Sequence, residues 1–106
     1  MIKKIKPLPI KKAREYSQKG RIRRINAIKN DCINTINSFI TAAGEEGETN
    51  TGTWFRNYSG FLTPSVIAEI VELFKAKGYN ITAEQTEDRE DYPENYYIRI
   101  DWNAAC

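Results

Sequence analysis

Apolar residues recur every three or four positions between Arg21 and Ala43, and this spacing predicts one long amphipathic helix. Lys29 is the only charged residue within the apolar stripe, whose other members are Ile22, Ile25, Ile28, Cys32, Ile36, Phe39, Ile40 and Ala43. Gly44 follows directly and is expected to end the helix in the left-handed conformation. We expect this stripe to form part of the core.

A second, polar face of the same helix carries Asn26, Asn30, Asn34, Asn37 and Thr41. Asparagine is a weaker helix former than the Glu and Lys that usually occupy a solvent face. The face therefore suggests a helix–helix or subunit contact in which amides form hydrogen bonds. A plain solvated face explains the pattern equally well, and both interpretations remain open.

The clearest helix boundaries enclose a second, shorter helix. Thr63 is a favoured N-cap and Pro64 a favoured first helical residue, while Leu62 can pack onto Ile67. The apolar pattern continues to Phe74, and Gly78 is expected to terminate the element. Local residue chemistry alone predicts this helix.

Three segments have the composition of β-strands: 53–58, 79–84 and 96–102. The last alternates between apolar and polar positions, which indicates one buried side, and it should form an antiparallel hairpin with the second. We predict an α+β fold in which the two helices pack on a small antiparallel sheet of about three strands, with an extended basic N-terminal arm. Such a sheet has two edges, which neighbouring molecules often cover.

The N-terminal 20 residues are expected to form this basic arm, and residues 21–106 a single domain. Pro7 and Pro9 favour an extended chain over residues 1–9. A short helix from Ile10 to Gln18 is only weakly indicated, and Gly20 is a candidate break before the long helix. A total of 106 residues suits one domain.

Charge is strongly segregated along the chain, although its formal net value is only +2. Residues 1–30 hold eleven Lys and Arg against one acid, whereas the other 76 residues hold five bases and thirteen acids. This asymmetry predicts that the N-terminal region binds phosphate groups or an acidic protein surface. The candidate partner-binding bases are Lys3, Lys4, Lys6, Lys11, Lys12, Arg14, Arg21, Arg23 and Arg24.

Trp54 and Arg56 are further candidates for partner binding, within a segment that places four aromatic residues between positions 54 and 61. One interpretation is that this strand closes the core. The other is an exposed recognition surface formed by aromatic rings and Arg56.

Several classes of chemistry find no support in the sequence. The chain has no histidine, and its two cysteines match no metal or redox spacing. No glycine-rich phosphate loop is present, so we expect neither a cofactor nor enzymatic activity. Mean hydropathy is −0.61, and the longest apolar runs are far shorter than the roughly 20 residues of a membrane span. Lysines interrupt the region after Met1, so we expect no secretion and no membrane association.

The segment from Ile36 to Trp102 resembles a pattern found in small, uncharacterised proteins of tailed bacteriophages. The resemblance rests on a helix ending in Ala42-Ala43-Gly44, on Leu62-Thr63-Pro64 leading into a helix that ends in Gly78-Tyr79, and on the alternating C-terminal strand. It implies a non-enzymatic part of a phage particle, as a head, connector or decoration component, located in the virion or the host cytoplasm. In such a particle the basic arm would bind neighbouring subunits. Two alternatives remain: a small nucleic-acid-binding protein that uses residues 3–29, and an inhibitor of a host or defence component.

Overall fold

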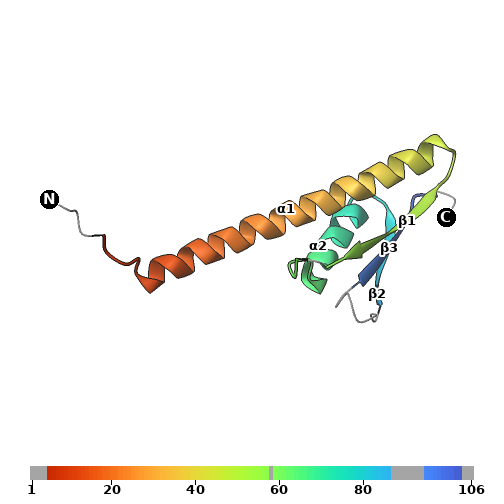
Figure 1. Ribbon diagram of the computed structural model, residues 1–106. Helices are drawn as coiled ribbons and strands as arrows, with labels where there is room; N and C mark the ends of the chain where they lie inside the picture. The colour runs from red at the N-terminus through yellow and green to blue at the C-terminus, as the bar shows by residue number, and fades with distance from the viewer. Residues whose placement is uncertain (1–4, 58, 87–94, 104–106) are drawn as a thin grey trace.

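The computed structural model describes residues 5–57, 59–86 and 95–103, which form two helices and three strands (Figure 1). In chain order the elements are α1 (Ile10–Glu45), β1 (Asn50–Arg56), α2 (Pro64–Lys75), β2 (Asn80–Thr86) and β3 (Asn95–Asp101). The expected α+β class, with a long and a short helix on a three-stranded antiparallel sheet, is confirmed.

The sheet has the order β1-β3-β2, so that β3 pairs with an antiparallel neighbour on each side. Ile98 of β3 lies opposite Thr53 of β1 and Ala83 of β2. Alternate residues of β3 point toward the helices and are buried, namely Tyr96, Ile98 and Ile100. The predicted hairpin of β2 and β3 is therefore confirmed, and β3 is the central strand.

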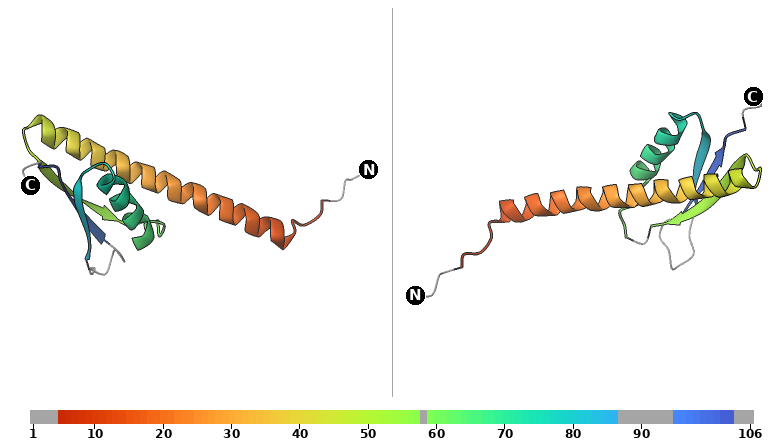
Figure 2. Two further views of the ribbon diagram at one scale, coloured as in Figure 1. Left: turned by 180° about the vertical axis from the view of Figure 1, so that it is seen from behind. Right: turned by 90° about the horizontal axis from the view of Figure 1, so that it is seen from above.

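The core lies between this inner face of the sheet and the two helices. The C-terminal part of α1 packs on β1, while α2 packs on β2 (Figure 2). The buried apolar side chains are Cys32, Ile36, Leu62, Val66, Ile67, Ile70, Phe74, Ile81, Tyr96, Ile98 and Ile100. Burial of this apolar surface is the main force that holds the two helices on the sheet.

Local capping determines both ends of α2, as predicted. The Thr63 hydroxyl accepts a hydrogen bond from the Val66 N–H at 3.4 Å, and Pro64 occupies the first helical turn. Gly78 adopts a φ of 99°, which reverses the chain toward β2. The end predicted for α1 was wrong, because the helix continues through Gly44 to Glu45. It is Gly47, with a φ of 85°, that adopts the left-handed conformation.

The expected start of α1 at Arg21 was also wrong, because the helix begins at Ile10. Residues 10–20 of the predicted extended arm are thus helical, and Gly20 does not interrupt them. One glycine costs about 1 kcal/mol relative to alanine, and the surrounding Ala, Arg, Gln and Lys residues are strong helix formers. The chain division expected at residue 20 is therefore not marked by any break in the helix.

Only part of the predicted apolar stripe of α1 lies in the core. Ile36 is 1% exposed and Cys32 is buried, whereas Ile22 is 53% exposed and Phe39 is 42% exposed. Over 36 residues, α1 is about 54 Å long and extends well beyond the sheet (Figures 1 and 2). The molecule measures 75 × 32 × 21 Å. It consists of a compact body, formed by the sheet, α2 and the C-terminal part of α1, from which the N-terminal part of α1 projects (Figure 1).

Replacing Ile36 by Asp should abolish folding, because an unpaired carboxylate in the core costs several kcal/mol. Ile22→Asp in the same helix is the matched control and should shift the melting temperature by only a few degrees. Circular dichroism melting curves measure both effects. Equal melting temperatures for the two variants would contradict the assignment of the core face.

Candidate functional site

The face of α1 that packs on the body changes its chemistry along the helix. Positions 11, 14, 18, 21, 25, 28 and 32 follow one another at steps of three and four, so they share one side of the helix. The first four are Lys, Arg, Gln and Arg, and the last three are Ile, Ile and Cys. The apolar three pack on the core, while the polar four belong to a stretch that projects away from it. We call residues 10–23 the free segment of α1.

Every side chain of the free segment is exposed. The segment carries six bases, Lys11, Lys12, Arg14, Lys19, Arg21 and Arg23, against the single acid Glu15. Its large apolar residues Ile10, Tyr16 and Ile22 are six positions apart, and each step of six turns about 120° around the helix axis. The segment is therefore basic on several sides and has no continuous apolar face.

Ahead of the free segment lies a short non-helical stretch, residues 5–9, which we call the tip segment. Ile5 is 94% exposed and Leu8 is 57% exposed, and Pro9 has the extended dihedral angles φ −61° and ψ 143°. Lys6 is exposed on the same stretch. Of the predicted partner-binding residues, Lys3 and Lys4 lie outside the described residues.

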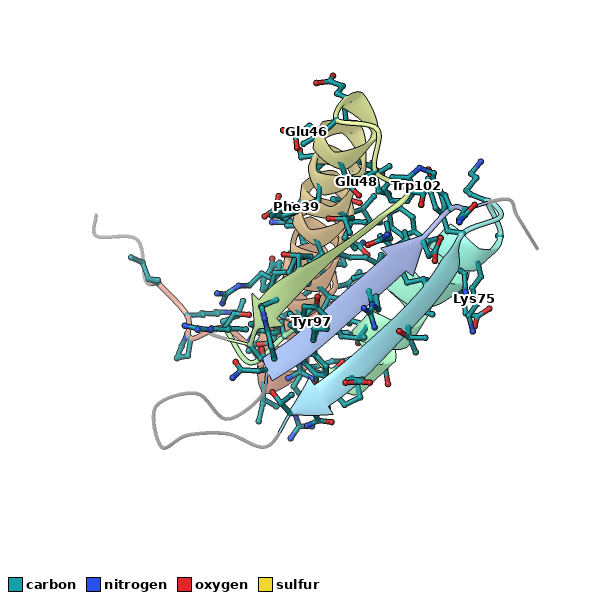
Figure 3. The ribbon with its side chains drawn as sticks, turned by 90° about the vertical axis from the view of Figure 1, so that its right-hand side faces the viewer. Phe39, Glu46, Glu48, Lys75, Tyr97 and Trp102 are labelled. Carbon is teal, nitrogen blue, oxygen red and sulfur yellow. The ribbon has the colours of Figure 1, made fainter. Side chains whose placement is uncertain are left out.

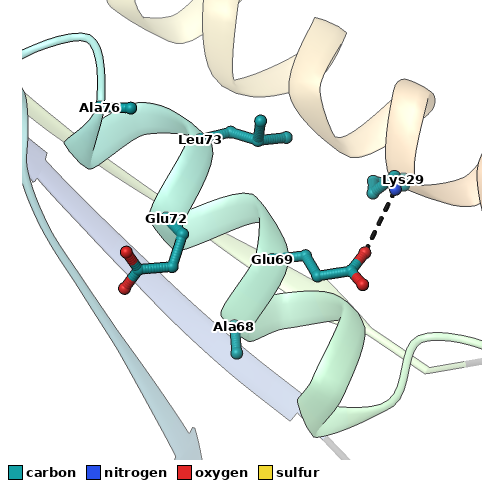
Figure 4. Close-up of a pocket in the computed structure, with 6 residues that line it drawn as sticks. All are labelled: Lys29, Ala68, Glu69, Glu72, Leu73 and Ala76. Atoms are coloured by element: carbon teal, nitrogen blue, oxygen red, sulfur yellow. Dashed lines mark hydrogen bonds and ion pairs between the residues drawn. The ribbon is translucent and has the colours of Figure 1, made fainter.

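Two contacts mark the junction where α1 meets the body. The Arg24 guanidinium lies over the Phe61 ring, 4.7 Å from its centroid, so this predicted binding residue already has a cation–π partner. The Lys29 Nζ donates to a carboxylate oxygen of Glu69 on α2 at 3.2 Å (Figure 4). Leu73, which is half exposed, lines the hollow between α1 and α2 beside this ion pair. These contacts orient α1 on the body.

The outer face of the sheet carries an exposed aromatic pair. Trp54 is 55% exposed, and the ring centroids of Trp54 and Tyr97 are 4.9 Å apart. Tyr97 lies on the face turned to the viewer in Figure 3, and a Cβ atom at Gly52 would meet its ring and hydroxyl. Arg56, two positions from Trp54, belongs to the same face and is exposed.

Trp54 and Arg56 therefore lie on the exposed outer face of the sheet, whereas the neighbouring Phe55 packs against the core. Their use in partner binding stays a hypothesis. The sequence did not single out Tyr97 or Gly52, because their proximity depends on the pairing of β1 with β3. The alternation along β3 was the only available signal, and it placed Tyr97 on the solvated side.

A second surface feature is an apolar groove between α2 and β2, which we call the α2–β2 groove. Ile67, Ala68 and Val71 line it from α2, and Ile81 and Ala83 line it from β2. Because the strand order is β1-β3-β2, no strand in the described part of the chain pairs with the outer edge of β2. Sequence reasoning had anticipated uncovered sheet edges but not this groove.

The Asn-lined face of α1 is fully exposed. Hydroxyl groups on this face bond within the helix, as Ser38 Oγ donates to the Asn34 carbonyl at 3.1 Å and Thr41 Oγ1 donates to the Asn37 carbonyl at 2.9 Å. Within the described residues nothing covers this face, so its use in a subunit contact stays a hypothesis.

No family model, curated protein or solved structure matches this chain. Among the described residues, no three His, Cys, Asp or Glu side chains are placed to hold a metal ion. In the same residues, neither helix combines the length and the apolar character needed to cross a bilayer.

Cys32 is buried, which removes its thiol from ready reaction. Burial, with a smaller contribution from the charge of Asp31, raises the pKa of Cys32 from 9.0 to about 11. The thiolate is the reactive form, so the folded protein holds almost none of it near neutral pH. The position suits a small core residue and not a nucleophile.

We expect Cys32 to resist labelling by a disulfide reagent at pH 8 in a Cys106→Ser background, and to react rapidly once urea unfolds the chain. The folded state retains the thiol proton up to about pH 11 while the unfolded state loses it near 9.0, so this group stabilises the fold below pH 9. That contribution decreases as the pH rises from 9 to 11. Rapid labelling of the native protein at pH 8 would contradict the burial of this thiol.

Proposed function

We propose that this protein is a non-enzymatic structural subunit that binds neighbouring copies through its N-terminal helix and tip segment. One observation carries the proposal: the most basic part of the chain stands away from its own body, with both its charged and its apolar side chains exposed. The body from which it projects is acidic. The two ends of the molecule are thus complementary to each other but do not meet within one chain.

The free segment lacks packing against the rest of the chain. Most helical stability in proteins comes from tertiary packing, and the 14 residues from 10 to 23, which extend a helix anchored on the body, have none. Exposed apolar residues at the outer end, Ile5, Leu8 and Ile10, add surface that binding would bury. A protein partner would pack against this helix and would bury these apolar side chains.

A second copy of the chain supplies such a partner. Opposite charge at opposite ends favours head-to-tail contacts, which form closed rings or open arrays according to the rotation between subunits. Exposed ion pairs contribute only about 0–1 kcal/mol each, so the apolar tip must provide most of the binding free energy. The bacteriophage resemblance of residues 36–102 makes a virus particle the setting that we propose for this assembly.

Nucleic-acid binding is the second candidate function, and the distribution of bases around the free segment favours it. An α-helix of about 10–12 Å diameter fits the major groove of duplex DNA, where phosphates lie on both flanks. Bases on several sides of the helix suit that position. The tip segment, in contrast, has apolar residues that a duplex does not require.

The assembly proposal predicts that mass by light scattering rises with protein concentration and falls on addition of salt. The triple variant Lys12→Gln, Lys19→Gln, Arg23→Gln should associate several-fold more weakly, because it removes three charges and keeps helix propensity. A Lys12→Arg, Lys19→Arg, Arg23→Lys variant, which keeps the three charges, is the control and should assemble like the parent. A parent protein that remains monomeric at millimolar concentration would overturn the proposal.

A titration with a 20-base-pair duplex at two salt concentrations tests the second candidate. Phosphate binding would give a log–log salt slope near −0.9 for each phosphate neutralised. Absence of binding at low salt would remove this candidate. Tight duplex binding by a protein that stays monomeric would replace assembly by nucleic-acid recognition.

A further inference from the structure

We propose that the tip segment of one copy adds as a strand to the outer edge of β2 in a neighbouring copy, with Ile5 and Pro7 in the α2–β2 groove. This inference rests on the assembly function proposed above and identifies the receiving surface. The two halves of the contact are an extended segment without a partner and a sheet edge beside an apolar groove.

The receiving surface has the two parts that strand addition requires. Alternate residues of an edge strand direct their backbone N–H and C=O groups away from the sheet, and no described strand pairs with β2 on that side (Figure 3). The groove beside this edge is lined by aliphatic side chains of α2 and β2. Backbone pairing supplies affinity in this mode of recognition, and the groove selects alternate side chains.

The tip segment has the backbone of a terminal strand. Pro7 and Pro9 are two positions apart, so in an extended chain both lack an N–H on the same edge. Lys6 and Leu8 present their N–H and C=O groups on the opposite edge, which can pair with β2. The prolines also restrict the unbound chain and lower the entropic cost of binding.

The side chains of the tip segment match the two faces of the sheet. Ile5 and Pro7 share one face of an extended chain, and this face would enter the groove. Lys6 lies on the other face, which continues the outer face of the sheet where β2 exposes Glu84. Glu72 on α2 also lines the groove, where it pairs with Lys75 at 3.8 Å, so Glu84 is the acid that faces Lys6 in this arrangement.

Distance excludes the chain's own groove as the target of its tip segment. The helix carries Ile10 about 21 Å beyond Arg24, where α1 first contacts the body. Five extended residues span at most about 18 Å. The occupant of the groove must therefore be the tip segment of another copy.

Two assembly-deficient variants test this contact. Ala68→Trp fills the groove and keeps the tip segment, whereas Ile5→Asp disables the tip segment and keeps the groove. Each variant alone should associate at least about tenfold more weakly than the parent, because one Ile buried in the groove is worth about that factor. Mixed together, they should form a 1:1 heterodimer that grows no further, as measured by light scattering.

Ala76→Trp, at the C-cap of the same helix, is the control, since Ala76 is exposed and does not line the α2–β2 groove, and this variant should assemble like the parent. Melting curves should show that all variants are folded. As an independent readout, hydrogen exchange at residues 81–85 of the parent should slow as concentration rises.

Failure of the mixture to form a heterodimer, while the parent assembles, would overturn the inference and leave the proposed function standing. Undiminished assembly of Ala68→Trp would do the same. A parent that never assembles would overturn both.

Discussion

The change of chemistry along one side of α1 is the constraint on which the rest of the structure depends. Ile25, Ile28 and Cys32 can be buried, whereas Arg14 and Arg21, on the same side of the helix, cannot be desolvated without paired acids. The helix consequently packs over its C-terminal part only. The elongated shape follows from where along α1 this change occurs.

Elements defined by local chemistry could be predicted from the sequence. The cap at Thr63, the proline that follows it and the glycine at 78 act within a few residues, so α2 emerged with its correct boundaries. The alternation of β3 likewise reports its own burial. The charge asymmetry that marks the free segment is also local in the chain, and it indicated the candidate binding region.

Features that depend on residues distant in the sequence could not be predicted. The outer aromatic pair requires that Trp54 lie opposite Tyr97, and nothing in either segment specifies that register. The α2–β2 groove requires β3 to lie in the middle of the sheet, which leaves β2 at the edge. At the helix ends, Gly20 and Gly44 were overestimated as breaks, because a single glycine costs less than the surrounding helix formers contribute.

The projecting helix gives the single chain an unusual hydrodynamic size. Its radius of gyration is 19.4 Å, while a compact protein of similar length has about 13 Å. By the same scaling, 19.4 Å corresponds to a compact chain of about 300 residues. One molecule will therefore sediment slowly for its mass and elute from a gel-filtration column earlier than a globular protein of the same length. Shape and association both bring the elution forward in this protein, so its oligomeric state has to come from a determination of mass.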